Sequence, residues 1–238
     1  MSFLYHTFFF DPLYNVLIFF FNILPWIDAG TVVIIVTILV RLIIFPLSRK
    51  AVLTQVKMAE IGPDLARIKE KYKDKAEEQA KMTLALYREK GVNPFSGILV
   101  IIIQIPIILA LYRIFIHFPE INSTLLYSFV GVPTQINTVF LGFLDITEKS
   151  IFLALLAAIS TFFQFRISMK GQTQPKGNSF GDNLTRSMQT QMKYFFPVIV
   201  FFISYTISGS IALYWLTTNL FSIGQELFVR RKLKTTVT

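Results

Sequence analysis

Long apolar runs that alternate with polar, charge-rich segments dominate the pattern of this chain. Three of the runs have roughly the 20 apolar residues that a bilayer-spanning helix needs; they are 31–47, 94–118 and 151–167. A fourth run, 194–229, would be about 54 Å long as one helix, whereas the hydrocarbon layer is roughly 30 Å thick. This run must fold back once, and the small polar residues at 208–210 are the expected turn. The pattern predicts an all-α membrane protein with five transmembrane helices.

The apolar stretch before the first span is shorter. Residues 11–25 are interrupted by Asn15 and Asn22 and bracketed by prolines, which leaves about a dozen continuous apolar residues, a length typical of an interfacial helix. We therefore expect residues 1–30 to form an extracytoplasmic segment with an amphipathic helix that lies on the membrane. A sixth spanning helix is the alternative.

Basic residues fix the expected orientation. Eleven Lys and Arg lie in 49–90, five in 166–193 and four in 230–234, whereas 1–30 holds none and 119–150 holds one. Because Lys and Arg in short loops stay on the cytoplasmic side, the N-terminus is expected outside and the C-terminus in the cytoplasm. The loop 119–150 is then extracytoplasmic, and the loop 168–193 and the basic tail 230–238 are cytoplasmic.

The polar segment 48–93 has a helix-forming composition and apolar residues at helical spacing. It predicts a cytoplasmic coiled-coil hairpin that is interrupted at 62–63, turns near 73–75 and ends at Gly91. The expected facing residues are Val52, Val56, Ala59, Leu65, Ile68 and Tyr72 against Ala76, Ala80, Leu84 and Tyr87. The hairpin is either simply a solvated structural element or a docking arm whose basic surface attracts ribosomal RNA or anionic lipid.

Arg41 is the most informative residue, because a guanidinium inside a spanning segment costs at least about 2.5 kcal/mol and persists where it faces a wet or polar interior. Counting 1.5 Å per residue from the helix ends places other polar residues at a similar depth. The candidate residues of a hydrophilic groove open to the cytoplasm are Arg41, Thr37, Gln104, Thr161, Gln164, Asn219, Ser222 and Gln225. The alternatives are an ion pair between Arg41 and Glu226, and hydrogen bonds that only hold the helices together.

Aromatic residues are expected to seal the outer end of this groove, namely Phe201, Phe202, Tyr214 and Trp215. Chemistry on bound substrates has little support, since the chain has no Cys and its two His lie far apart. Metalloprotease, nucleophile-elbow and phosphate-loop motifs are missing from the sequence as well. We expect no enzyme, no metal site and no cofactor.

Four segments, in their order along the chain, resemble the YidC family of membrane-protein insertases. They are TILVRLIIFPLSRKAVLTQVKM, YREKGVNPFSGILVIIIQIPIILALYRIF, QMKYFFPVIVFF and IALYWLTTNLFSIGQELFVRRK. The resemblance covers roughly 12–232 and implies a groove open to lipid, in which Arg41 matches the family's groove arginine and Gln164 a groove glutamine. It further implies the bacterial inner membrane, nascent membrane proteins as substrates, and the lipid bilayer, the Sec translocon and the ribosome as partners.

Two departures from the family pattern concern the ends of the chain. Many relatives carry a large outer-side domain between an extra N-terminal span and the core, and we expect this chain to lack both. The basic tail that strengthens ribosome binding in some relatives is short in this sequence. An anion channel or transporter that uses Arg41 as its binding charge is the alternative function. The paired repeats typical of transporters are not found in the sequence, which favours the insertase.

Overall fold

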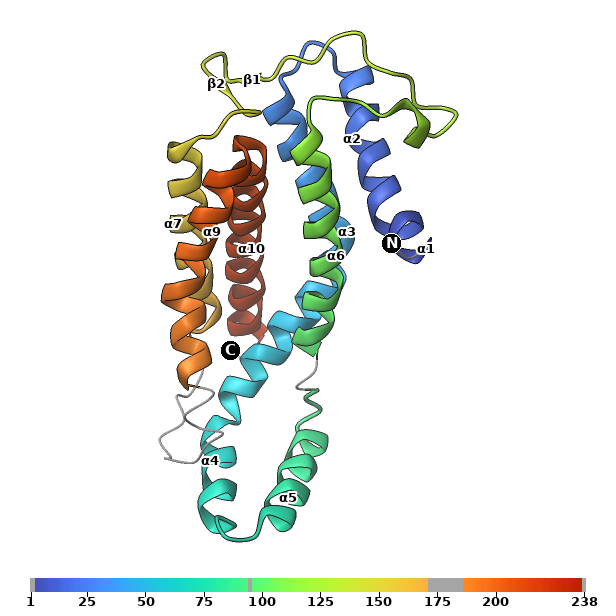
Figure 1. Cartoon of the computed structure of the whole chain (residues 1–238). Helices are drawn as coiled ribbons and strands as arrows, with labels where there is room; N and C mark the ends of the chain where they lie inside the picture. The colour runs from blue at the N-terminus through green and yellow to red at the C-terminus, as the bar shows by residue number, and fades with distance from the viewer. Residues whose placement is uncertain (1–2, 94–95, 171–185, 237–238) are drawn as a thin grey trace.

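Helices make up most of the residues that the structure describes. The computed structural model describes residues 3–93, 96–170 and 186–236 of the 238-residue chain. Figure 1 shows long helices that run side by side, a helical hairpin below them and an irregular loop region above them. The predicted mostly helical architecture is confirmed, with one two-stranded sheet in the loop region as an addition.

Three helical stretches have the length and the apolar composition needed to cross a membrane. They are Phe3–Ile23, which comprises α1 (Phe3–Tyr5), η1 (His6–Phe10) and α2 (Asp11–Ile23), then α3 (Ala29–Glu60) and α7 (Ile151–Ser168). A fourth helix, α6 (Ser96–His117), has a shorter apolar part, Ile102–His117, among its described residues. These helices are consistent with a helical membrane protein.

The long fourth apolar run folds back where the sequence predicts. After the π-helical turn η3 (Gln191–Phe195), α9 (Phe196–Ile207) is followed by Ser208, and α10 (Gly209–Thr236) begins immediately after it. A Cβ atom at Gly209 would lie 3.1 Å from Cα of Ile146, so the turn needs glycine for this close approach. Helix α10 continues through most of the expected tail 230–238, because no helix-breaking residue follows Val229 before Thr236.

The bundle is organised around α10, which packs between α7 and α3. Ala157 on α7 and Ala212 on α10 are completely buried, and such small residues let helix backbones approach closely. Helix α9 packs against α7, and α6 packs against the opposite side of the bundle on α3. The order of the helices therefore places α3 and α10 at the centre, where the predicted polar residues are concentrated.

The N-terminal segment differs from the expectation. Its helix begins at Phe3, so the helical stretch is 21 residues long and passes through both predicted interruptions. Asn15 donates to the carbonyl of Leu125 at 2.9 Å and Asn22 to that of Gly131 at 2.6 Å, so both tie the helix to the outer loop. In Figure 1 the helix runs alongside α6, with the N-terminus level with the middle of the bundle. The predicted short surface helix was wrong in length, and its position relative to the membrane stays a prediction.

The hairpin has the predicted turns, but its first arm is not a separate element. Helix α3 continues without a break from the bundle to Glu60, and α4 (Gly62–Lys71) and α5 (Ala76–Glu89) follow. The turn at 72–75 agrees with the prediction, whereas the interruption lies at Ile61, just before the predicted 62–63, and Gly62 and Pro63 belong to α4. Gly91, at φ +59°, ends α5 as expected, because this left-handed conformation favours glycine.

The two arms of the hairpin touch over a small area. Ile61, Leu86 and Val92 form a buried cluster, with Leu65, Ile68 and Tyr87 packed around it. Leu84, predicted to face the partner arm, is 55% exposed, and Ala76 and Ala80 are exposed as well. The predicted stripe on α5 was wrong at these positions, because the apolar contacts between the arms gather around Leu86.

The loop 119–150, predicted to lie outside the membrane, covers one end of the helices (Figure 1). It contains the turn η2 (Ser123–Leu125) and the strands β1 (Val139–Phe140) and β2 (Leu144–Asp145), which pair antiparallel. Backbone hydrogen bonds fasten it to two helices: Ala29 donates to the carbonyl of Asn137 at 2.7 Å, and Ser210 donates to that of Ile146 at 2.8 Å. We call residues 119–150 the outer cap.

Candidate functional site

Polar side chains from three helices meet at Arg41. Arg41 lies about 18 Å along α3 from the first residue of that helix, at 1.5 Å per residue. One guanidinium nitrogen is 3.5 Å from the carbonyl oxygen of Thr218 on α10, and the ring of Tyr214 lies near the same charge. The hydroxyl of Tyr214 accepts a hydrogen bond from Gln104 on α6 at 2.8 Å. We call Arg41, Gln104 and Tyr214 the arginine group.

The guanidinium of Arg41 is poorly satisfied by protein acceptors. Arginine carries five N–H donors, and in the described part of the chain the Thr218 carbonyl is the single acceptor in hydrogen-bond range, at the upper limit of distance. The sequence alternative of an ion pair with Glu226 is excluded, because Glu226 binds Arg230 at 2.8 Å. A half-buried charge with spare donors needs water or another polar ligand beside it.

Tyr214 stands between the polar level and the outer half of the bundle. It is 5% exposed, its hydroxyl is bonded to Gln104, and its ring lines a small cavity between α2, α3 and α6. Most residues around this cavity are apolar; they include Leu17, Val33, Val36, Leu111 and Phe115. An amphipathic ring at this boundary can hold a polar group on one side and exclude water on the other.

A second polar cluster lies between α7 and α10. The side-chain amide of Asn219 donates to Thr161 at 2.7 Å and to Ser160 at 3.0 Å, and both hydroxyls donate to the carbonyl of Ala157. All three side chains are almost completely buried, and Asn219 is only 5% exposed. The cluster therefore acts as interhelical hydrogen bonding, which was the alternative reading for Thr161 and Asn219.

The remaining predicted groove residues fall into two groups: some are buried with their hydrogen bonds made inside the bundle, and others keep unused hydrogen-bonding capacity. Thr37 is buried and donates to Val33 of its own helix at 2.6 Å, and Gln225 is buried and donates to Ser48 on α3 at 2.7 Å. Ser222 is half-buried, with its hydroxyl on the Thr218 carbonyl at 2.8 Å. Gln164 is half-buried and has no hydrogen bond to any residue in the described ranges. Gln164 and Ser222 thus keep unused hydrogen-bonding capacity, as Arg41 does.

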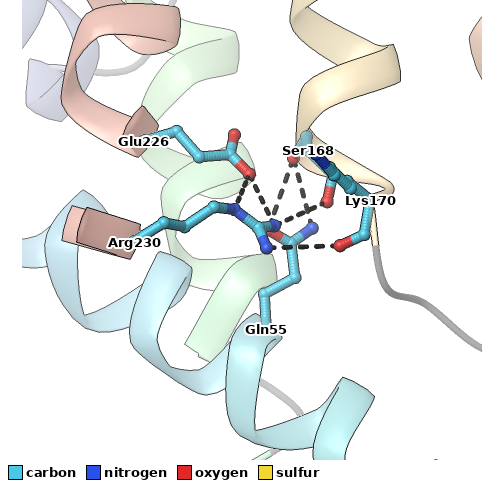
Figure 2. Close-up of polar contacts among 5 residues, drawn as sticks. All are labelled: Gln55, Ser168, Lys170, Glu226 and Arg230. Atoms are coloured by element: carbon cyan, nitrogen blue, oxygen red, sulfur yellow. Dashed lines mark hydrogen bonds and ion pairs between the residues drawn. The ribbon is translucent and has the colours of Figure 1, made fainter. Parts of the chain in front are cut away.

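A third polar cluster joins α3, α7 and α10 at the cytoplasmic end predicted by the basic residues (Figure 2). Arg230 binds Glu226 of its own helix at 2.8 and 3.0 Å and donates to the carbonyls of Ser168 at 3.3 Å and Lys170 at 3.2 Å. Gln55 on α3 exchanges hydrogen bonds with the Ser168 hydroxyl. Arg230 therefore caps the C-terminal end of α7. We call these five residues the inner clamp.

The inner clamp was missed by the sequence analysis, which assigned Arg230 to a free tail and considered Glu226 only as a partner of Arg41. The signal was present, since Glu226 and Arg230 are spaced i and i+4 on one helix, the spacing of an ion pair. What the sequence did not contain was the position of the last turn of α7, whose carbonyls complete the cluster.

Three of the four aromatic residues predicted to seal the groove form no hydrogen bond or ring contact with the arginine group within the described part of the chain. Phe202 on α9 is 58% exposed, and Phe201 is half-buried and stacks on Tyr205 with ring centroids 6.1 Å apart. Trp215 is half-buried at the edge of the core, so Tyr214 is the one member that reaches the arginine group. The outer ends of α3 and α10 are instead covered by the outer cap, through Phe140 and the fully buried Ile146.

Comparison with known proteins places the chain in a family. Residues 19–236 match the model of the 60Kd inner membrane protein, which covers most of the described bundle and hairpin. The chain belongs to this family, the family of the YidC insertases. A YidC relative from Listeria innocua, the membrane protein insertase YidC 2, is 33% identical over 207 residues. Relatives named membrane protein insertase YidC from Wolinella succinogenes and Francisella tularensis subsp. novicida are 28% and 31% identical.

The match covers nearly all of this chain but only part of each YidC relative. It covers 85% of this chain against the Listeria protein and 94% against the Francisella protein. The chain spans 64% of the Listeria protein and 38% of the Francisella protein. The residues matched by the family model, 19–236, include Arg41 and both polar clusters of α10. As a member of the YidC family, the chain is a multi-pass membrane protein.

Proposed function

We propose that this chain is a membrane-protein insertase and chaperone, without enzymatic activity, of the bacterial inner membrane. The proposal rests on one observation above all: Arg41, inside the bundle, has several donors and, among the residues that the structure describes, a single long hydrogen-bond contact. Membership of the YidC family and the names of the relatives support the same conclusion. We further propose nascent membrane proteins as substrates, and the lipid bilayer, the Sec translocon and the ribosome as partners.

The proposed topology has five spans. They are the bundle part of α3, then α6, α7, α9 with the helical residues before it, and the first part of α10, with the N-terminus outside and the C-terminus inside. The support comes from the basic residues, of which eleven lie in 49–90 and one in 119–150. Phe3–Ile23 is proposed to lie along the outer half of the bundle, an arrangement supported by its bonds to the outer cap.

The proposed groove lies at the arginine group and holds water that is continuous with the cytoplasm. Arg41, Gln164 and Ser222 are proposed to contact the substrate, since their hydrogen-bonding capacity is not used up within the described chain. Thr37, Thr161, Asn219 and Gln225 are proposed to hold the helices around it, and Gln104 to orient Tyr214. This division follows from the partners of each side chain.

The mechanism is a reduction of the desolvation cost. A polar or acidic segment that crosses the membrane loses its water, at a cost of several kcal/mol for each unpaired charge. The guanidinium of Arg41 offers such a segment a counter-charge and hydrogen bonds partway across. The adjoining apolar helix of the substrate then moves sideways into lipid, and no cofactor is needed.

Site-specific crosslinking tests this function. A photoreactive residue at Arg41, Gln164 or Ser222 should crosslink to a ribosome-stalled nascent membrane protein. The same residue at Thr161, which is buried among α7 and α10, serves as the matched control and should give little product. Equal crosslinking at all four positions, or none at the first three, would contradict the proposed groove.

Substitution of Arg41 separates the insertase from the anion channel. Arg41→Ala should impair insertion of a short single-span substrate with an acidic outer tail, and Arg41→Lys should restore part of it, because the charge is kept while the bidentate geometry is lost. Insertion is measured by protease protection of the tail in cells depleted of the resident insertase. Normal insertion by Arg41→Ala together with a loss of anion flux in vesicles would favour the channel.

A further inference from the structure

Four large apolar residues at the proposed outer end of the molecule, away from the arginine group, are more than 60% exposed. Trp26 is 74% exposed, Phe129 and Phe143 are each 73% exposed, and Leu141 is 64% exposed. Trp26 lies in the turn between α2 and α3, and the other three belong to the outer cap. Such exposure of several large apolar residues in one region marks an interaction surface.

Hydrogen bonds to α2 and α3 fasten the segments that carry Phe129, Leu141 and Phe143 at the ends of the helices. Phe129 neighbours Val130, which is 7% exposed, and Gly131, whose carbonyl accepts from Asn22 near the end of α2. Leu141 and Phe143 form the tip of the hairpin β1–β2, which is fixed through Asn137 to Ala29 at the start of α3. In Figure 1 the outer cap spreads sideways, with the hairpin above α7 and the segment after α6 beyond α2.

Leu141 provides an independent argument about the environment of this surface. Its φ is +53°, followed by Gly142 at +79°, so the tip is a tight turn that favours Asn-Gly or Gly-Gly. A leucine in the left-handed conformation is strained, and an exposed leucine in water offsets none of this strain. An apolar surrounding for the side chain would offset it, since burial of a leucine side chain is favourable.

We infer that these four residues form an anchor that inserts into the head-group region of the outer leaflet. Tryptophan at the ends of membrane-crossing helices favours this layer, where its amphipathic ring meets both hydrocarbon and water. Phe and Leu side chains of interfacial segments enter the boundary between head groups and acyl chains. The surface lies at the membrane boundary if the helices span as proposed, so the inference rests on that part of the proposed function. The anchor would hold the outer cap on the lipid and keep the outer end of the bundle closed.

The two tryptophans of the chain make the anchor measurable. Trp215→Phe leaves Trp26 as the single fluorophore, and Phe143→Trp or Phe129→Trp, each with Trp26→Phe and Trp215→Phe, reports on the outer cap. The proteins are reconstituted in phosphatidylcholine vesicles with nitroxide-labelled lipids. One lipid carries the label near the head group, and the other carries it deep in the acyl chain.

Two control positions calibrate the depth. Ile43→Trp replaces a 78% exposed residue in the middle of α3, and Leu84→Trp replaces a 55% exposed residue on α5 of the hairpin. Both are made in the same tryptophan-free background. The tryptophan at position 43 should be quenched most by the deep label, and the one at position 84 by aqueous iodide and by neither lipid.

The anchor predicts that the three outer tryptophans are quenched more by the shallow label than by the deep one and are shielded from iodide. Leu141→Asn, which suits the left-handed turn, should raise iodide quenching at position 143 without loss of helical content. Iodide quenching equal to that at position 84 would overturn the inference while position 43 still reports a spanning helix. Shielding from both iodide and lipid labels would indicate a protein partner or a second copy, which also overturns it. Failure at position 43 would remove the proposed spans and the anchor with them.

Discussion

Removal of Arg230 should destabilise the bundle more than removal of Arg230 and Glu226 together. The carboxylate side chain of Glu226 is 4% exposed, and Arg230 gives it two hydrogen bonds at 2.8 and 3.0 Å. Arg230→Met leaves this carboxylate buried without its cation, and breaking a buried pair in this way costs about 3–5 kcal/mol. The variant also removes the donors to the carbonyls of Ser168 and Lys170.

The two single variants should differ in size. The Arg230 side chain is 22% exposed and keeps both α7 carbonyls when Glu226 is replaced by Leu, so it can still be solvated. Glu226→Leu should therefore cost less than Arg230→Met. The double variant leaves no buried charge, and only the carbonyls of Ser168 and Lys170 lose their hydrogen-bond donor. The free energy of unfolding should therefore fall by about 1–3 kcal/mol.

Thermal unfolding in detergent, monitored by the accessibility of buried residues, gives the order of stability of the unmodified protein, the two single variants and the double variant. Lys75→Met serves as the control, because its ion pair with Glu78 at 3.0 Å is exposed on both sides and should contribute within about 1 kcal/mol. The reasoning is refuted if Arg230→Met shifts the midpoint no more than Lys75→Met. It also fails if the double variant is as unstable as Arg230→Met, because the cost would then not arise from a stranded charge.

Three further predictions concern other contacts of the bundle. Gly209→Ala should cost about 1–3 kcal/mol, read as a lower unfolding midpoint, because its Cβ would lie 3.1 Å from the backbone of Ile146. Asn219→Ala should cost about 1–2 kcal/mol, from interhelical bonds averaging about 0.6 kcal/mol each. At matched protein levels it should leave insertion nearly unchanged, whereas a loss comparable to Arg41→Ala would make Asn219 a groove residue. Burial acts to raise the pKa of Asp145, but hydrogen bonds from two threonines lower it below its ordinary value. The stabilisation that ionised Asp145 gives the outer cap is then present above about pH 3.9 and is lost as the pH falls through the folded pKa. Hydrogen exchange of the outer cap, corrected for intrinsic rates, should therefore rise in this pH range in the native chain and not in Asp145→Asn.

The positions of the helices follow closely from the apolar runs, because the membrane sets both the length and the composition of a spanning helix. The turn at Ser208 was predicted for the same reason, since a longer helix could not fit. The continuity of the first span with the hairpin was not predicted: both segments were expected to be helical, and α3 runs through them without a break to Glu60, because a helix has no reason to stop where its surroundings change from lipid to water. Pro46 lies inside α3 and did not end it.

The sequence allows an estimate of the depth of each polar residue, but not of the direction in which its side chain points. A rise of 1.5 Å per residue gives the depth of each polar side chain, which is why Asn219 and Arg41 were expected together. Which neighbour a side chain meets depends on the rotation of each helix about its axis, and the sequence gives this rotation only roughly. Asn219 faces α7 and Arg41 faces α10, so residues at similar depth belong to separate clusters.

The two ends of the bundle explain how Arg41 remains poorly paired. At the outer end, backbone hydrogen bonds from Ala29 and Ser210 fix α3 and α10 to the same cap. At the inner end, Gln55 and Arg230 tie these helices to the last turn of α7. Between these ties the helices have little freedom to close around the guanidinium and supply it with carbonyl acceptors. A guanidinium that the fixed helices leave without protein acceptors is preorganised for a ligand. The free-energy cost of keeping it unpaired is borne by the folded bundle and not by the ligand.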